Sequence, residues 1–186
     1  LRRRVADDER RFSDLAGEYV AMADECRLEG MDPAPVIANY DKALSLAPDH
    51  VGALMGKGRT YFDAGAYEDA LGCFDRAVEV ASAHVAVSAD SDTGESDEKA
   101  SRGGVTDYSQ VLSDALFIGG RACNHVDDPA GALDRYLRAE AGNNGKKPEL
   151  HDCMADLYES VGDDTSASTH RAIARKLRTA SRRRKK

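Results

Sequence analysis

Residues 51–78 read VGALMGKGRTYFDAGAYEDALGCFDRAV, and this stretch decides the fold of the 186-residue chain. Leu54, Gly58 and Tyr61 follow one another at the spacing of a single helical face, which predicts a first helix. Gly65 comes next, and glycine readily takes the left-handed conformation that ends many helices. A second helical face then carries Tyr67, Ala70, Phe74, Ala77 and Val78. The stretch therefore predicts two helices joined by a tight turn.

The same pattern recurs in three further segments, with a period of about 34 residues. The equivalent residues are Val36, Tyr40 and Ala43 in the first unit, Gly120, Cys123, Ala132, Tyr136 and Ala139 in the third, and Ala155, Tyr158, Gly162, Ala167, Arg171 and Ala174 in the fourth. The four units cover residues 17–50, 51–84, 113–147 and 148–181. Such units bury their apolar faces only against neighbouring units, so the period predicts a stack of helix pairs.

The residue types at fixed positions of each unit have a physical reason. Gly58 and Ala70 let two helix backbones approach closely, and Phe74 fills the gap between successive units. Pro33 and Pro129 stand at the starts of second helices, where a missing backbone N–H costs nothing. These positions make the spacing specific to helix–turn–helix repeats.

These motifs resemble those of the tetratricopeptide repeat (TPR) family over most of the chain, in about four units. The second unit has the expected residue type at Gly58, Tyr61, Gly65, Tyr67, Ala70, Phe74 and Ala77. Four positions depart from the pattern. In the second unit Leu54 replaces the early Trp of the family and Lys57 replaces its first-helix Leu, Asp24 replaces the early glycine of the first unit, and Arg171 replaces the large aromatic residue of the fourth. The resemblance implies an all-α fold, a right-handed superhelical solenoid of antiparallel helix pairs.

The remaining segments extend or interrupt this array. We expect an N-terminal helical extension at 1–16 running into repeat 1, repeats 1 and 2 at 17–84, an acidic disordered insertion at 85–107, repeats 3 and 4 at 108–181 and a basic tail at 182–186. A single long helix is expected from about residue 5 to residue 29, either packing on a preceding repeat or capping the array. The insertion is either a loop tolerated at a turn or a regulatory loop phosphorylated at Ser91, Thr93 or Ser96.

The sequence shows no catalytic constellation. It has neither a nucleophile motif nor a phosphate-binding glycine loop, and its four cysteines and five histidines are scattered without a metal-ligand spacing. Asp127–Asp128 and Asp163–Asp164 precede second helices, where acids cap the first turn. We therefore expect no catalytic residue, no cofactor and no metal ligand, and a protein that is not an enzyme.

Function is then expected on a surface, and the resemblance implies a concave groove lined by the first helices. The groove-facing positions are Met55, Arg59, Phe62, Phe117, Arg121 and Asn124 in the central units, with Glu18, Ala21, Glu25, Glu29, Asp152, Asp156 and Glu159 at the ends. An apolar, partly basic centre and acidic ends suit a protein or peptide partner with apolar anchors and basic flanks.

One subclass of the family clamps the carboxylate of chaperone C-terminal peptides with Lys and Asn. The equivalent positions here hold Ala21, Glu25, Gly56, Asp114 and Ile118. We therefore expect no binding of chaperone C-terminal peptides.

Charge is unevenly distributed within the formal net charge of −7. Residues 17–170 carry a net charge of −17, whereas residues 171–186 hold nine basic residues and no acid. The basic tail consists of Arg182, Arg183, Arg184, Lys185 and Lys186. It offers an alternative function, a nucleic-acid or ribonucleoprotein-associated subunit, or it is a solvated terminus.

The ends and the apolar content of the chain bear on its location. No apolar run reaches the roughly 18–20 residues of a membrane span, and no signal peptide follows Leu1. We expect an intracellular, cytoplasmic scaffold or adaptor, with a nuclear address in the tail as the alternative. The missing initiator Met leaves a further alternative, a repeat segment of a larger enzyme.

Overall fold

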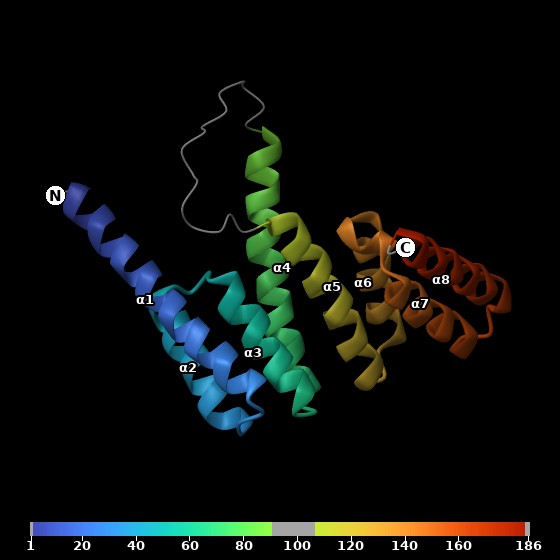
Figure 1. Cartoon of the computed structure of the whole chain (residues 1–186), viewed down its shortest axis with the longest axis horizontal. Coiled ribbons are helices and arrows are strands. Elements are labelled where there is room, and N and C mark those ends of the chain that lie inside the picture. The colour runs from blue at the N-terminus through green and yellow to red at the C-terminus, as the bar shows by residue number, and fades with distance from the viewer. Residues whose placement is uncertain (1, 91–106, 185–186) are drawn as a thin grey trace. The chain divides into compact units, whose positions relative to one another are not determined.

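The structure is a computed structural model that describes residues 2–90 and 107–184. Within these residues it contains eight α-helices, one short 3₁₀ helix and no strand (Figure 1). The elements are α1 (Arg2–Leu28), α2 (Pro33–Leu46), α3 (Val51–Asp63), α4 (Tyr67–Asp90), α5 (Tyr108–His125), α6 (Pro129–Ala141), η1 (Asn143–Lys146), α7 (Pro148–Ser160) and α8 (Asp164–Arg184). The chain divides into two compact structural units, with the boundary inside α4. From here on, the first unit is Leu1–Val80 and the second unit is Ala81–Lys186, and the four sequence units are called repeats.

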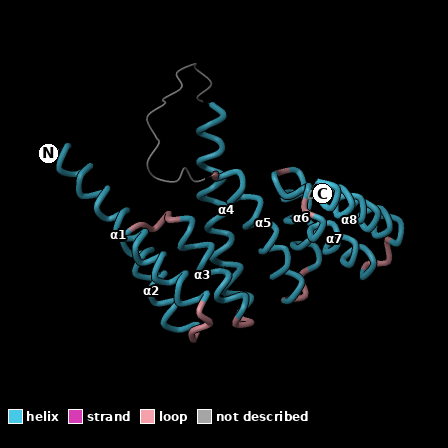
Figure 2. Tube along the Cα trace, in the orientation of Figure 1, coloured by secondary structure: helices cyan, strands magenta, loops and turns pink. Residues whose placement is uncertain are grey.

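In the first unit, α1 and α2 form an antiparallel pair and α3 packs against both of them (Figure 2). Their core consists of Ala16, Ala23, Val36, Tyr40, Ala43 and Ala53. The Tyr40 hydroxyl donates a hydrogen bond of 2.6 Å to Asp24, the residue that replaces the early glycine of the first repeat. Burial, followed by the neighbouring Asp24 carboxylate, raises the pKa of Tyr40 to about 12. This hydrogen-bonded pair therefore holds α1 against α2. In the second repeat, the equivalent position is Gly58, which allows a close backbone approach instead.

The close approach expected at Gly58 is present between α3 and α4, and its partner is Phe74 of the same repeat. Phe74 is fully buried, and a Cβ atom added to Gly58 would lie 2.8 Å from its Cε1 atom. The third repeat has the same arrangement between α5 and α6, where a Cβ on Gly120 would lie 2.6 Å from Cε1 of Tyr136. Glycine at these two positions therefore allows the paired helices to approach each other over an aromatic ring.

In the second unit, α5 pairs with α6 and α7 pairs with α8, while η1 links α6 to α7. Its fully buried side chains include Tyr136, Leu150 and Met154. The predicted all-α fold of antiparallel helix pairs is thus confirmed.

Helix starts and ends follow local sequence chemistry. Prolines open α2, α6 and α7, as the sequence predicts for Pro33 and Pro129. Asp128 caps α6 by accepting a 2.9 Å hydrogen bond from the backbone N–H of Gly131. Gly65, with φ of 79°, ends α3 in the expected left-handed conformation. Asp127 takes the same place after α5 with φ of 59°, a conformation that short polar side chains tolerate.

The boundaries of three segments differ from those expected. The helix α1 begins at Arg2, and α4 continues to Asp90, so the insertion starts later than residue 85. Residues 91–106, with the three proposed phosphorylation sites Ser91, Thr93 and Ser96, lie outside the described residues. The helix α8 continues to Arg184, so Arg182 and Arg183 are helical, while Lys185 and Lys186 lie outside the described residues. Across 2–90 and 107–184, no helix combines the length and the apolar character needed to cross a membrane.

Candidate functional site

The central groove residues predicted in the first unit lie on α3 and differ in exposure. The predicted end positions Glu18, Ala21 and Glu25 are exposed on α1, and Glu29 is exposed just after it. Met55 is only 8% exposed and belongs to the core, so it packs the helix instead of offering an anchor at the surface. Arg59 and Phe62 are half-buried. The Phe62 ring contacts Tyr67 of α4 edge to face, with ring centroids 5.3 Å apart. The first unit therefore presents Arg59 and part of Phe62, and little else from this set.

The predicted residues of the second unit lie on α5, one and two turns apart. Phe117 is half-buried with its ring centroid 6.2 Å from that of Tyr136, while Arg121 and Asn124 are exposed. The Asn124 side-chain amide donates a 3.0 Å hydrogen bond to the Tyr136 hydroxyl. Burial, followed by the neighbouring Cys153, raises the pKa of Tyr136, so this hydroxyl stays protonated at neutral pH. Asn124 is therefore held in position by a buried side chain.

A pocket of about 310 Å³ opens beside Asn124 within the second unit. Its walls come from the end of α5, the turn into α6, and α7, and its lining residues are Asn124, Asp127, Pro129, Asp156, Leu157 and Ser160. The left-handed backbone at Asp127 places this carboxylate in the turn beside Pro129. The pocket thus combines apolar surface from Pro129 and Leu157 with two carboxylates.

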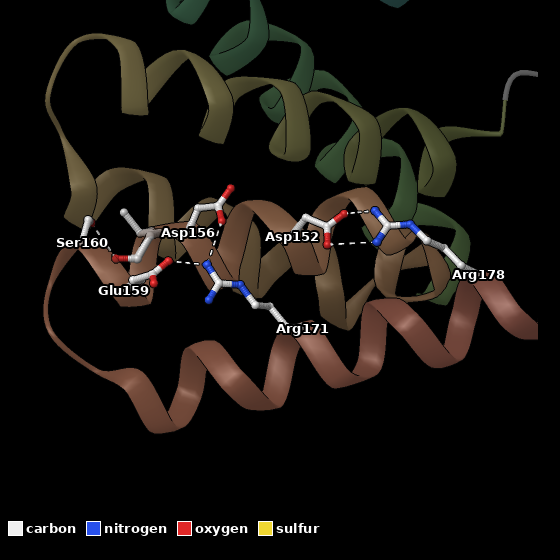
Figure 3. Close-up of polar contacts among 7 residues, drawn as sticks. Asp152, Asp156, Glu159, Ser160, Arg171 and Arg178 are labelled. Atoms are coloured by element: carbon white, nitrogen blue, oxygen red, sulfur yellow. Dashed lines mark hydrogen bonds and ion pairs between the residues drawn. The ribbon is translucent and has the colours of Figure 1, made fainter.

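The α7 acids that were predicted at one end of the groove form ion pairs with arginines of α8 (Figure 3). Arg171 forms ion pairs with Glu159 and, at 3.5 Å, with Asp156. Arg178 contacts both oxygens of Asp152. The hydrogen bond from Arg171 lowers the pKa of Glu159. Arg171, which replaces the aromatic residue of the repeat, therefore partly compensates the acidic charge of α7.

A second polar cluster holds the start of α5 against the α6–α7 linker. Asp114 accepts hydrogen bonds from Lys147 at 2.6 Å, from Gln110 at 2.9 Å and from the fully buried Asn144 at 3.1 Å. Partial burial would raise the pKa of Asp114, but the hydrogen bonds from Lys147, Gln110 and Asn144 outweigh it and lower the pKa. Asp114 is therefore an anion at neutral pH at one of the positions compared with the chaperone clamp.

Sequence reasoning missed a group of side chains that meet inside the second unit. His151 of α7 and His170 of α8 have their Nδ1 atoms 3.1 Å apart, and Glu140 of α6 lies beside them. The available signal was the repeat itself, because residues at similar distances before and after the Gly162 turn face each other in an antiparallel pair. Burial lowers the pKa of His170 against the opposing effect of Glu140, which favours the neutral imidazole.

Comparison with known proteins places this geometry among helical repeats. No family model and no curated protein matches the sequence. Among solved structures, the MamA RS-1 ArsTM double mutant has a TM-score of 0.65 at 16% identity, with 89% of this chain and 76% of that chain covered. YrrB, described as a TPR protein with an unusual peptide-binding site, has a TM-score of 0.62 at 19% identity, covering 86% of this chain and 66% of YrrB.

The N-terminal domain of stress-induced protein-1 from C. elegans has a TM-score of 0.58 at 18% identity, and the match covers 78% of this chain and 96% of that domain. At these identities the likeness is one of fold. It agrees with the antiparallel helix pairs, the turn residues and the aromatic contacts described above. The chain therefore has the TPR-like fold of stacked helical repeats.

Proposed function

We propose that this chain is a non-enzymatic protein-interaction scaffold that binds a peptide or helix of a partner on the first-helix face of its second unit. The observation that carries the proposal is the pocket beside Asn124, because two of its lining residues, Asn124 and Asp156, are positions that the repeat phase assigns to the groove. Its volume of about 310 Å³ lies at the lower end of the range for ligand pockets, about 300–1,000 Å³. It suits one anchoring side chain of an extended or helical partner.

The lining of the pocket indicates the chemistry of that partner. Pro129 and Leu157 supply apolar surface, and Asp127 and Asp156 place carboxylates at the same opening. The Arg171 guanidinium lies 3.5 Å from an oxygen of Asp156, which is longer than a hydrogen bond of normal strength. Asp156 is therefore only weakly paired, and its carboxylate can attract a cationic ligand group. An apolar anchor flanked by Lys or Arg therefore complements the site.

Two further observations support this proposal. YrrB, which shares the fold, is described as having a peptide-binding site, although fold alone does not transfer function. The anionic Asp114 stands where a carboxylate clamp would need a cation or an amide, so it repels a terminal carboxylate. The proposed partner is consequently an internal segment with basic flanks and not a chaperone C-terminal peptide.

The test is selection of random peptides displayed on phage against the intact chain, followed by calorimetry with the enriched sequences. We expect an apolar residue next to Lys or Arg to be enriched. The double variant Asp127→Asn and Asp156→Asn should bind these peptides roughly three- to tenfold more weakly, the effect of losing partly exposed charges. Asp134→Asn, an exposed acid paired with Arg138 on α6, is the matched control and should bind as the parent chain does.

A variant of the predicted groove residue Arg121 tests whether a bound peptide extends from the pocket along the first-helix face. Arg121→Glu on α5 adds negative charge to the first-helix face, so it should strengthen capture of the same basic-flanked peptides if they extend along this face. If no peptide is enriched above background, or if the pocket variants and the Asp134→Asn control bind alike, the proposed surface is wrong.

A further inference from the structure

The second unit contains one cluster of metal-ligating side chains among the described residues. Glu140 lies on the last turn of α6, His151 lies on α7, and His170 lies on α8. One potential ligand atom from each residue lies within 4.8 Å of the others. We propose that Glu140, His151 and His170 bind a divalent transition-metal ion of the Zn²⁺ class.

The separations between the ligand atoms suit such an ion. The two histidine Nδ1 atoms are 3.1 Å apart, and His151 Nδ1 lies 3.6 Å from Glu140 Oε1. A tetrahedral zinc ion with bonds of about 2.0–2.2 Å holds neighbouring nitrogen and oxygen ligands about 3.3–3.5 Å apart. The two distances from His151 bracket that value, and all three ligand atoms lie within 4.8 Å of one another, so side-chain adjustments can bring both histidines and the carboxylate to one ion.

The hydrogen bonds around His151 fix which of its ring nitrogens can bind a metal. Its Nε2 atom lies 3.0 Å from the Gly145 carbonyl oxygen in η1, and a carbonyl oxygen only accepts hydrogen bonds. Nε2 therefore carries a proton, and in a neutral ring the lone pair is on Nδ1, the atom that faces His170 and Glu140. A backbone carbonyl on the opposite nitrogen is the usual arrangement behind a metal-binding histidine.

In this tautomer the His151 lone pair faces the Glu140 carboxylate, an unfavourable contact that a bound cation would relieve. His170 Nδ1–H can donate to the His151 lone pair across 3.1 Å, but the Glu140 carboxylate then faces that lone pair at 3.6 Å with no proton of its own to offer. A metal ion accepts electron pairs from all three groups at once. His151 is 1% exposed, whereas Glu140 and His170 are half-buried, so the cluster is enclosed on one side and reachable on the other.

Rings around the cluster restrict its movement. His170 stacks on His151 with centroids 5.4 Å apart and on Tyr158 with centroids 5.5 Å apart. A bound ion would therefore join three helices and, through Gly145, the η1 linker. Two histidines and a carboxylate leave a fourth position of the tetrahedron for water or an added ligand.

Calorimetric titration of the full chain with ZnCl₂ tests the site. We expect saturable binding of one ion per chain and a higher unfolding temperature with zinc present. His170→Phe keeps a flat ring against Tyr158, and Glu140→Gln keeps the shape of the carboxylate, so both variants should fold. Each should bind zinc at least about tenfold more weakly, whereas His125→Gln, at an exposed histidine of the same unit, should bind normally.

Cobalt distinguishes these ligands from the four cysteines of the chain. Co²⁺ bound to nitrogen and oxygen shows ligand-field bands without the thiolate-to-cobalt charge-transfer absorption. The proposal is overturned if zinc binding is not saturable, if the thiolate absorption appears, or if His170→Phe and Glu140→Gln bind zinc as the parent chain does. Circular dichroism of each variant establishes that a loss of binding is not a loss of folding.

Discussion

The substitution Gly58→Ala should destabilise the first unit, although alanine forms helices better than glycine. In the interior of an exposed helix, glycine to alanine gains roughly 0.5–1 kcal/mol. At position 58, however, the new Cβ would lie 2.8 Å from Cε1 and 3.0 Å from Cζ of Phe74, and 3.1 Å from Cβ of Cys73. The intrinsic gain of alanine therefore competes with a steric conflict between α3 and α4.

The conflict is costly because neither neighbour can move away cheaply. Phe74 is 0% exposed, so its ring has no open space to enter, and the Cβ of Cys73 is fixed to the backbone of α4. Excess volume of this kind in a packed core typically costs about 1–3 kcal/mol. After the helical gain of alanine is subtracted, we expect Gly58→Ala to lower the free energy of unfolding by up to about 2.5 kcal/mol, with the middle of both ranges giving about 1 kcal/mol.

Gly72→Ala supplies the matched control, since it makes the same change in α4 of the same unit. No atom lies within 4 Å of a Cβ at position 72, so this variant should gain roughly 0.5–1 kcal/mol. Urea unfolding followed by circular dichroism measures both, and an unchanged slope against urea shows that the extent of unfolding is the same. In a Phe74→Leu background the penalty of Gly58→Ala should fall, because only the tight contact with Cβ of Cys73 remains. If Gly58→Ala and Gly72→Ala shift the urea midpoint in the same direction, the steric reasoning is refuted.

Substitutions at three other positions test single contacts. Tyr40→Phe removes the buried hydroxyl that donates to Asp24 and should lower the free energy of unfolding by about 1–3 kcal/mol, measured by urea unfolding. Asp128→Ala removes the cap on the Gly131 N–H and should cost about 1 kcal/mol in the same assay, whereas Asp128→Asn should recover most of it. The lowered pKa of Asp114 means that its stabilising effect is present above the unfolded value of about 3.9 and is lost as the pH falls through the folded value. The stability difference between the parent chain and Asp114→Asn should therefore shrink on acidification below about pH 4, and a constant difference would contradict this assignment.

The helix pairs could be predicted from the sequence because the repeat fixes residues whose roles are local. Gly65 has the predicted left-handed conformation, and Phe74 and Tyr136 are fully buried as their repeat positions require. The first repeat departs from the pattern at Asp24. In the structure the Tyr40 hydroxyl uses that carboxylate as its hydrogen-bond acceptor, so the departure is itself a contact.

The candidate site was less accessible to sequence reasoning, because it depends on how far each helix turns toward its neighbour. Met55 shares its helical face with Arg59, yet only 8% of it is exposed. The meeting of His151 and His170 depends on the register of α7 against α8, which no short motif encodes. Spacing along the chain therefore identifies the helices that form a surface but not the side chains that reach it.

The replacement at Arg171 shows how one departure from the repeat alters the site itself. An aromatic residue here would fill the interface between α7 and α8, as Tyr136 does between α5 and α6. Arg171 is half-buried and extends its guanidinium to Glu159 and Asp156, so charge pairing replaces ring packing in the last pair. Because Glu159 is the closer partner, the compensation falls mainly on an acid outside the pocket. Asp156 keeps more of its field for the pocket, and together with Asp127 of the α5–α6 turn it is the basis for expecting basic flanks in a bound peptide.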